Sequence, residues 1–257
     1  MERQEEKPFR PGYFQLVRRN SYNFIFAGKL LVLYELSQLL LSGELQVTNA
    51  IDSLFKQAFA AIPQGTLYVS LGLLLIGLFV LAQDHRQGYK IRLGVFGWMW
   101  AESLLWALVV FFNLSLLVRY LPLNMSLAVG ANGLLPMLTG SGITYAQKLS
   151  LSLGAGFYEE LFFRLILVKL ILLGLVFAGM RRDGLGTQFL VVLITAILFS
   201  LAHFQFVIGG AGDAWGWYPF FYRAAFGVIM SLLLLLRGFG ITAWTHALYD
   251  ILVFTLV

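Results

Sequence analysis

Long apolar runs dominate the chain, and short segments that carry most of the charges separate them. A helix that crosses a bilayer needs about 20 predominantly apolar residues. Such runs predict about seven spans (six to eight), at residues 22–41, 66–82, 93–118, 161–178, 187–206, 220–236 and 239–257. Because the apolar runs are continuous and do not alternate with polar positions, they exclude a membrane β-barrel. We therefore predict an all-α fold, a polytopic transmembrane helical bundle.

Two stretches are too mixed to cross a membrane. Residues 44–65 combine Glu44, Asp52 and Lys56 with large apolar side chains, which is typical of an amphipathic helix lying in the interface. Residues 121–142 contain two prolines and several glycines and are interpreted as a surface loop or a re-entrant segment. We expect one or two interfacial amphipathic segments beside the spans.

The composition narrows the function classes. Hydrophobic residues make up 59% of the chain and charged residues 12%, whereas an ordinary soluble domain carries about 25% charged residues. A soluble enzyme, a disordered chain and a nucleic-acid-binding protein are thereby excluded. The absence of cysteine removes disulfides, thiolate metal sites and cysteine nucleophiles.

The lysines and arginines are distributed unevenly along the chain. They concentrate in the first 21 residues, after the second and fourth spans and at Arg237, while the alternate connections carry few. Because cytoplasmic loops are enriched in basic residues, the N-terminus is placed in the cytoplasm and the C-terminus outside. We expect residues 1–21 to form a basic cytoplasmic tail.

Ionisable side chains within spans are costly and mark candidate functional sites. The densest cluster is Glu159, Glu160 and Arg164. Glu160 and Arg164 are four residues apart and share a helix face, so they are expected to pair, whereas Glu159 points about 100° away and is free for chemistry. The structural alternative is that both glutamates begin the helix, where the helix dipole favours acids.

Two of the three histidines lie in further short motifs. His203 follows Phe199 by one helical turn, and His246 is four residues before Asp250, which is close enough for a hydrogen bond. Each motif has a structural alternative, a packed histidine in the first case and a polar clamp between helices in the second. Arg223, in contrast, is expected to extend towards the membrane interface.

Helix lengths predict the depth of these groups. The run from residue 161 to 179 is ~28 Å long and the run from 187 to 203 is ~25 Å long, so the glutamates and His203 are expected near the same, non-cytoplasmic boundary. His246 lies only nine residues after Arg237, or ~14 Å, which predicts a position nearer the middle of the membrane.

A carboxylate and a neutral imidazole that share a water molecule remove its proton as it attacks a carbonyl group. A second histidine with a hydrogen-bonding neighbour stabilises the oxyanion that forms. This constellation favours peptide hydrolysis without a covalent intermediate, in a polar cavity within the membrane.

The ordered motifs, Glu159-Glu160-x-x-x-Arg164, Phe199-x-x-x-His203 and His246-x-x-x-Asp250, resemble those of the CPBP (CAAX protease and bacteriocin-processing) intramembrane endopeptidases. This group includes the Ras-converting type of CAAX prenyl protease. The resemblance covers about residues 149–257. It implies that Glu159 and His203 activate water, that Glu160 and Arg164 support the site, and that His246 and its partner form the oxyanion pocket. The family has Asn or Asp at the last place, and this chain has Asp250.

The resemblance also implies an endopeptidase without a metal or other cofactor. The short chain and the absence of cysteine favour a bacterial member in the cell membrane. Its partners would be the lipid bilayer and a membrane-associated, prenylated or unmodified protein or peptide cleaved near its C-terminus. Residues 22–142 would form the N-terminal transmembrane helices and loops and residues 143–257 the catalytic core. Three alternatives stay open: a zinc-dependent membrane protease that uses the same residues, a proton-coupled transporter, and a non-catalytic immunity or scaffold protein.

Overall fold

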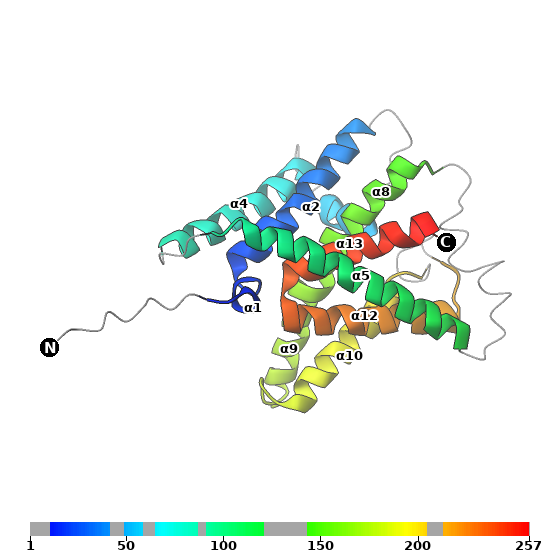
Figure 1. Cartoon of the computed structure of the whole chain (residues 1–257). Helices are drawn as coiled ribbons and strands as arrows, with labels where there is room; N and C mark the ends of the chain where they lie inside the picture. The colour runs from blue at the N-terminus through cyan, green and yellow to red at the C-terminus, as the bar shows by residue number, and fades with distance from the viewer. Residues whose placement is uncertain are drawn as a thin grey trace.

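The computed structural model describes residues 11–41, 49–58, 65–86, 91–120, 143–204 and 213–256. The regular elements among these residues are helices, and an isolated β-bridge joins Phe204 to Asp213. Figure 1 shows the helices packed as a bundle, with the C-terminal helix α13 running between its neighbours. The predicted all-α class is therefore confirmed, whereas the segment 121–142 lies outside the described residues.

In the described part of the chain five helices are long and apolar enough to cross a membrane: α2 (Asn20–Leu40), α4 (Gly65–Arg86), α5 (Gly94–Tyr120), α12 (Trp217–Arg237) and α13 (Phe239–Leu256). A sixth apolar helix, α10 (Leu185–Leu201), is shorter. The seventh is a continuous helical run composed of α8 (Tyr145–Gly154), η1 (Ala155–Glu159), η2 (Leu161–Leu167) and α9 (Val168–Phe177). Together they agree with the predicted transmembrane bundle of about seven spans.

The composite helix begins well before its predicted span. Thr144 accepts a hydrogen bond from the Gln147 backbone N–H, and the Gln147 side chain accepts one from the Thr144 N–H. This reciprocal capping satisfies two amide groups that a helix start leaves unpaired. The helix is π-helical in η1 and η2, a geometry that is rare and often found at functional sites.

Helix α13 forms the centre of the bundle. In its most apolar 18-residue window 61% of the residues are buried, compared with 11% in α4. Its Trp244 contacts Trp100 of α5 and donates a hydrogen bond to the Phe26 carbonyl oxygen of α2. Chemically active side chains on α13 are therefore held between several other helices.

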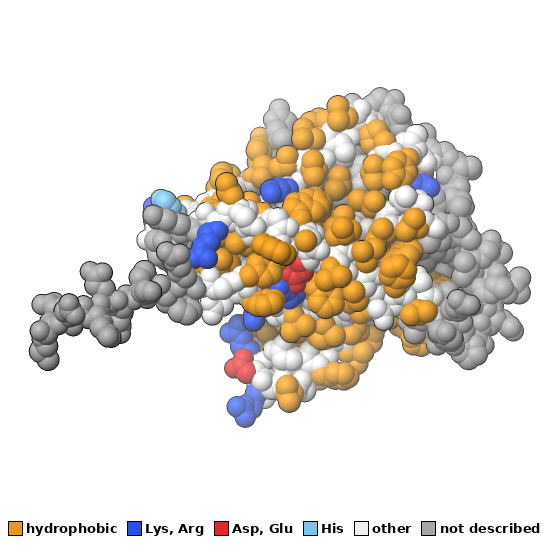
Figure 2. Space-filling model, viewed as in Figure 1, with side chains coloured by type: hydrophobic (Ala, Val, Ile, Leu, Met, Phe, Trp, Pro, Cys, Tyr) orange, Lys and Arg blue, Asp and Glu red, His pale blue; other side chains and the backbone are white. Residues whose placement is uncertain are grey.

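Apolar side chains also cover the outside of the bundle. Figure 2 shows hydrophobic side chains spread across the visible face, and those of Leu105 and Phe112 on α5 are each 60% exposed. A soluble monomer rarely leaves so much apolar surface in contact with water. The surface is that of a protein surrounded by lipid.

The chain is packed before the first span begins. Residues 1–10 lie outside the described residues, but α1 (Tyr13–Leu16) is helical and Leu16 is buried. Tyr13 donates a 2.6 Å hydrogen bond to Glu102, which also pairs with Arg237. Burial and the hydrogen bond to Glu102 raise the pKa of Tyr13. The predicted cytoplasmic tail is therefore, from Tyr13 onwards, part of the bundle.

Arg237 also ends α12, and a single residue separates that helix from α13. Gly238 has a φ of +88°, which an L side chain rarely adopts. The neighbouring Gly240 N–H donates a 2.6 Å hydrogen bond to Asn23 of α2. The turn is therefore held inside the bundle.

A small helix, α3 (Ala50–Ala58), lies within the predicted interfacial segment 44–65. It packs against α4 and η1, and Ile51 and Asp52 are buried. The flanking residues 44–48 and 59–64 lie outside the described residues. The described part of this segment thus packs against the helix that carries the adjacent residues Glu159 and Glu160.

Candidate active site

Glu159 and His203 face each other. Glu159 lies at the end of η1 and His203 in the turn after α10, and their Oε2 and Nε2 atoms are 3.6 Å apart. The Nδ1 of His203 is 2.7 Å from the carbonyl oxygen of Phe199, one turn earlier. Because a carbonyl oxygen only accepts, Nδ1 carries the proton of the neutral ring and the Nε2 lone pair points towards Glu159.

Glu160 lies between two partners. Its Oε1 is 2.7 Å from His246 Nδ1, and its Oε2 is 3.1 Å from Arg164 Nε. The contact with Arg164 is close enough for an ion pair, although its angle falls short of a hydrogen bond. Glu160 and Arg164 are 0% and 1% exposed, so each charge depends on the other for compensation.

Asp250 completes the group on the other side of His246. Its Oδ2 is 3.6 Å from His246 Nε2, and its side chain is 23% exposed. The predicted i, i+4 pair is thus formed, at a distance beyond that of a hydrogen bond. The two ring nitrogens of His246 therefore face two different carboxyl groups, Glu160 and Asp250.

A glycine brings the two helices that carry these groups close together. A Cβ atom at Gly156 would lie 2.6 Å from both the Ala243 carbonyl oxygen and the Ala247 Cβ. Real Cβ atoms do not approach other atoms so closely, so η1 and α13 pack at this distance only because residue 156 lacks one. This close approach lets Glu160 reach His246.

Aromatic rings enclose the charged groups. The Arg164 guanidinium lies 4.3 Å from the centre of the Phe199 ring, a distance typical of a cation–π contact. Phe199 also contacts His203 at 4.7 Å between ring centres, and Phe226 contacts His246 at 4.8 Å. Phe199 thus packs against both the Arg164 guanidinium and the His203 ring.

One structural alternative is excluded, and one expectation from the sequence was wrong. The glutamates do not begin a helix, since the helical run starts at Tyr145, so the dipole explanation for them does not apply. Arg223 does not extend to an interface but is 8% exposed and pairs with Asp213. This ion pair and the β-bridge between Phe204 and Asp213 connect α12 to the residue after His203.

His246 lies 2.7 Å from Glu160, although the count of residues from Arg237 predicted a position deeper in the membrane than that of the glutamates. That prediction took Arg237 as a marker of the membrane boundary, but Arg237 is 8% exposed and bound to Glu102. The turn that starts α13 consequently lies inside the bundle.

A cavity of about 370 Å³ lies around the ion pair of Glu102 and Arg237, away from the six predicted site residues, none of which lines it. Its other lining residues are Tyr13, Phe14, Trp98, Ala101, Leu105 and Trp106.

One contact to the site was not predicted. Asn49, in the N-terminal half, donates a 2.8 Å hydrogen bond from Nδ2 to Glu159 Oε1. The signal in the sequence is an asparagine immediately before the amphipathic stretch of α3, which is typical of a helix N-cap. That pattern predicts the cap but gives no indication of the contact with Glu159.

The zinc alternative requires several ligands in one place. Among the residues that the structure describes, no group of three or more His, Asp or Glu side chains is arranged to hold a metal ion. The described contacts instead divide the six residues into the Glu159–His203 pair and the chain that joins Arg164, Glu160, His246 and Asp250.

Comparison with known families bears on the same segment. Residues 141–252 match the family model described as type II CAAX prenyl endopeptidase Rce1-like, and this stretch contains all six side chains. We refer to residues 141–252, which match this family model, as the Rce1-like domain. The Rce1-like domain is consistent with the CPBP resemblance and supports an intramembrane endopeptidase as the general activity. No curated protein and no solved structure matches the chain.

Proposed function

We propose that the Rce1-like domain hydrolyses a peptide bond near the C-terminus of a membrane-associated protein or peptide, using water activated by Glu159 and His203. The observation that carries this proposal is the 3.6 Å approach of Glu159 Oε2 and His203 Nε2. Both atoms are hydrogen-bond acceptors when His203 is neutral, and acceptors so close together need protons between them.

A water molecule satisfies this requirement. Placed about 2.8 Å from both atoms, it donates one hydrogen bond to Glu159 and one to His203. As the water oxygen attacks the scissile carbonyl carbon, one proton passes to this pair. The C–N bond then breaks, and the pair returns the proton to the leaving nitrogen, so the products are a carboxyl group and an amine.

His246 is proposed to stabilise the oxyanion. Its Nδ1–H is committed to Glu160, which Arg164 holds in place. When the ring is protonated on both nitrogens, the Nε2–H is available to the developing oxyanion. Asp250 faces this nitrogen and is proposed to balance the charge of the imidazolium and orient the ring.

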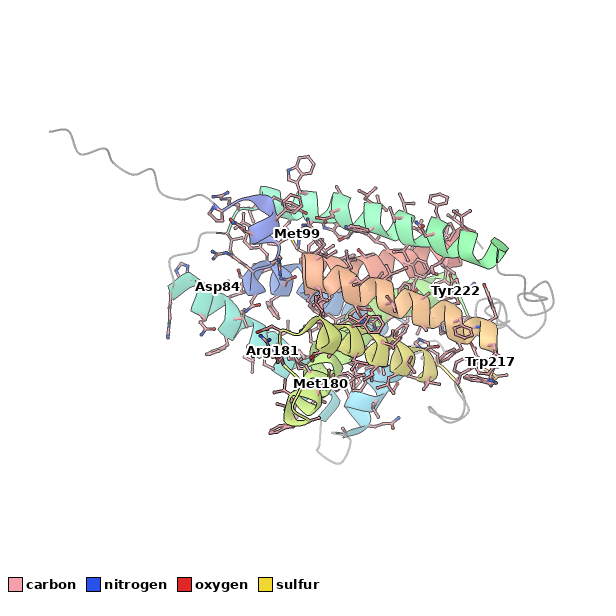
Figure 3. The ribbon with its side chains drawn as sticks, turned by 90° about the horizontal axis from the view of Figure 1, so that it is seen from below. Asp84, Met99, Met180, Arg181, Trp217 and Tyr222 are labelled. Atoms are coloured by element: carbon pink, nitrogen blue, oxygen red, sulfur yellow. The ribbon has the colours of Figure 1, made fainter. Side chains whose placement is uncertain are left out.

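The remaining features of the proposal concern substrate and placement. We propose a substrate with a prenylated or unmodified C-terminal segment, residues 143–257 as the catalytic core, and a bacterial cell membrane with the N-terminus in the cytoplasm. In Figure 3 Arg181, in the turn between α9 and α10, lies at the opposite end of α10 from Trp217. This separation supports the orientation, since basic residues favour the cytoplasmic side.

The test is cleavage of prenylated and unmodified C-terminal peptides by the purified protein, followed by mass spectrometry. Glu159→Gln and His203→Ala are each expected to remain folded and to lose activity by about two orders of magnitude or more. The matched controls Asp183→Asn and His85→Ala change exposed residues of the same types and should cleave like the wild type. Unchanged cleavage in Glu159→Gln and His203→Ala would refute the mechanism, whereas no cleavage by the wild type would favour the transporter and scaffold alternatives.

A further inference from the structure

The side chain of Asn49 connects the start of α3 to the proposed catalytic glutamate. Asn49 is 7% exposed and immediately precedes α3. Its Oδ1 accepts hydrogen bonds from the backbone N–H groups of Ile51 at 3.0 Å and Asp52 at 3.4 Å. Its Nδ2 donates to Glu159 Oε1 at 2.8 Å. One amide group therefore caps a helix and contacts the active site.

The helix cap fixes the direction of this amide. If the Asn49 amide were turned by 180°, its NH₂ group would face two backbone N–H donors, and its oxygen would face the Glu159 carboxylate. Both contacts of the turned amide place like partial charges together and leave buried polar groups unpaired, which is costly. The N-terminus of α3 thus ensures that a donor points at Glu159.

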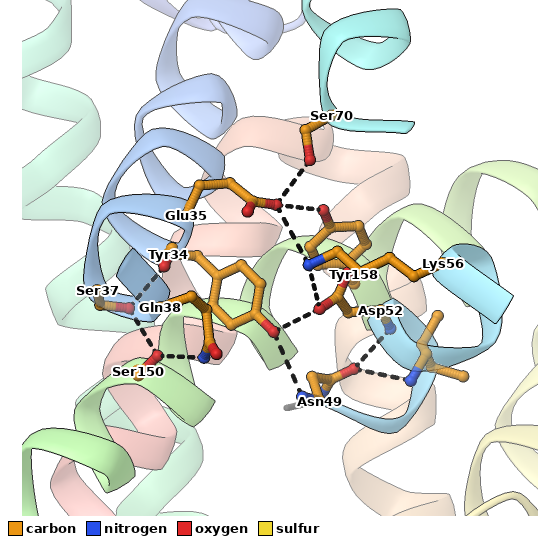
Figure 4. Close-up of polar contacts among 11 residues, drawn as sticks. Tyr34, Glu35, Ser37, Gln38, Asn49, Asp52, Lys56, Ser70, Ser150 and Tyr158 are labelled. Atoms are coloured by element: carbon orange, nitrogen blue, oxygen red, sulfur yellow. Dashed lines mark hydrogen bonds and ion pairs between the residues drawn. The ribbon is translucent and has the colours of Figure 1, made fainter. Parts of the chain in front are cut away.

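A polar network, buried at Tyr34 and Asp52, holds α3 in position (Figure 4). Tyr34 of α2 donates a 2.6 Å hydrogen bond to Asp52, and it accepts one from the Asn49 backbone N–H at 3.4 Å. Lys56 contacts Asp52 at 2.9 Å and Glu35 at 3.7 Å. Asn49 is therefore anchored through its side chain, its backbone and the first two turns of the helix it caps.

The same network reaches the composite helix. Tyr158, the residue before Glu159, donates a 2.9 Å hydrogen bond to Glu35. Glu35 also accepts a 2.7 Å hydrogen bond from Ser70 of α4. Because Tyr158 and Asn49 are held by one network, the donor and the carboxylate that it contacts keep a fixed relation to each other.

We propose that Asn49 is a positioning residue for Glu159 and that it lies outside the Rce1-like domain. By holding Oε1, it stops rotation of the carboxylate and leaves Oε2 directed at His203 and the attacking water. This inference rests on the proposed function, because it assigns to Asn49 the task of orienting the general base. It assigns part of the active site to the N-terminal half of the chain.

The competing explanation is that Asn49 only caps α3. Aspartate and serine are helix caps about as good as asparagine. An ionised aspartate has no proton to donate, and a serine hydroxyl at position 49 is too short to bridge to Glu159. Asn49→Asp and Asn49→Ser therefore keep the cap and remove the contact with Oε1.

Steady-state cleavage by both variants tests the proposal. Each is expected to lower kcat by about 10- to 100-fold, as loss of a hydrogen bond to a charged group suggests. Asn49→Ser should keep KM and the thermal midpoint near those of the wild type, whereas Asn49→Asp places a second buried carboxylate beside Glu159 and should also lower the midpoint. In Asn49→Asp the added carboxylate favours protonation of Glu159, so the acidic limb of the kcat–pH profile should move to higher pH. The matched control Asn113→Ser, on an exposed face of α5, should leave kcat unchanged.

Wild-type kcat in both Asn49 variants would overturn the proposal, while full activity in Glu159→Gln would overturn the proposed function instead. A measurement without turnover keeps the two separate. Subtracting the infrared spectrum of Glu159→Gln from that of the wild type gives the carboxylate band of Glu159. The same subtraction, with Asn49→Ser present in both proteins, gives this band without the amide donor. We expect the band to shift when the amide donor is lost, and an unshifted band refutes the contact.

Discussion

Removing the Arg164 charge should destabilise the protein far more than it disturbs the shape of the site. In Arg164→Met an unbranched apolar chain replaces the guanidinium and leaves the Glu160 carboxylate buried without its cation. Breaking a buried ion pair costs about 3–5 kcal/mol. Glu160 keeps the 2.7 Å contact with His246, so we expect the lower end, about 3 kcal/mol.

The double variant Glu160→Gln/Arg164→Met tests whether the loss comes from the uncompensated charge of Glu160. Glutamine carries no charge that would be left unpaired, and it still offers an oxygen to His246 Nδ1. In the described structure the Nη1 and Nη2 atoms of Arg164 have no hydrogen-bond partner, so the wild-type pair is itself incompletely compensated. Replacing such a pair by neutral groups is often neutral or stabilising, and the double variant should therefore recover most of the lost stability.

Thermal unfolding in one detergent at one scan rate, followed by circular dichroism, measures both effects. A loss of about 3 kcal/mol corresponds to a fall in Tm of about 6–12 °C for a chain of this size. Lys169→Met, which removes an exposed cation from the same helix, is the matched control and should shift Tm by less than about 2 °C. A Tm for Arg164→Met equal to that of this control, or a double variant no more stable than the single one, would refute the argument.

Three further predictions follow from the packing and charges of the site. Gly156→Ala should lower the free energy of unfolding by about 1–3 kcal/mol, because the added Cβ overlaps α13. Thermal unfolding of this variant is compared with that of Gly174→Ala, where the added Cβ meets open space. Asp250→Asn should keep kcat within about tenfold of the wild type, since the amide still orients His246 and only the charge balance is lost, and a loss as large as that of Glu159→Gln would contradict this role. Activity should survive dialysis against a chelator, and its loss with recovery on adding Zn²⁺ would support the metal alternative.

The sequence predicted the helical class and the charged groups that meet, because both depend on local patterns. Continuous apolar runs determine the spans, and an i, i+4 spacing places Glu160 beside Arg164 whatever surrounds them. The predicted pair of Glu159 and His203 also lies together in the structure at 3.6 Å. Their catalytic roles stay predictions until the variants are assayed.

Contacts between distant segments could not be predicted from those patterns. Arg237 resembles a residue at the end of a span, and only the position of Glu102 on α5 makes it buried. The start of the composite helix at Tyr145 was missed because residues 145–154 are more polar than the span that follows. Asn49 was missed because its contact with Glu159 depends on how α3 docks, which no periodicity encodes.

The contact between Asn49 and Glu159 has a consequence for the order in which the protein is made. The two residues are 110 positions apart in the chain. At a synthesis rate of about 5–20 residues per second, the ribosome makes the amide about 5–20 s before the carboxylate. The acidic segment thus follows its future neighbour into the membrane, and the early helices provide a partner before the costly charge arrives.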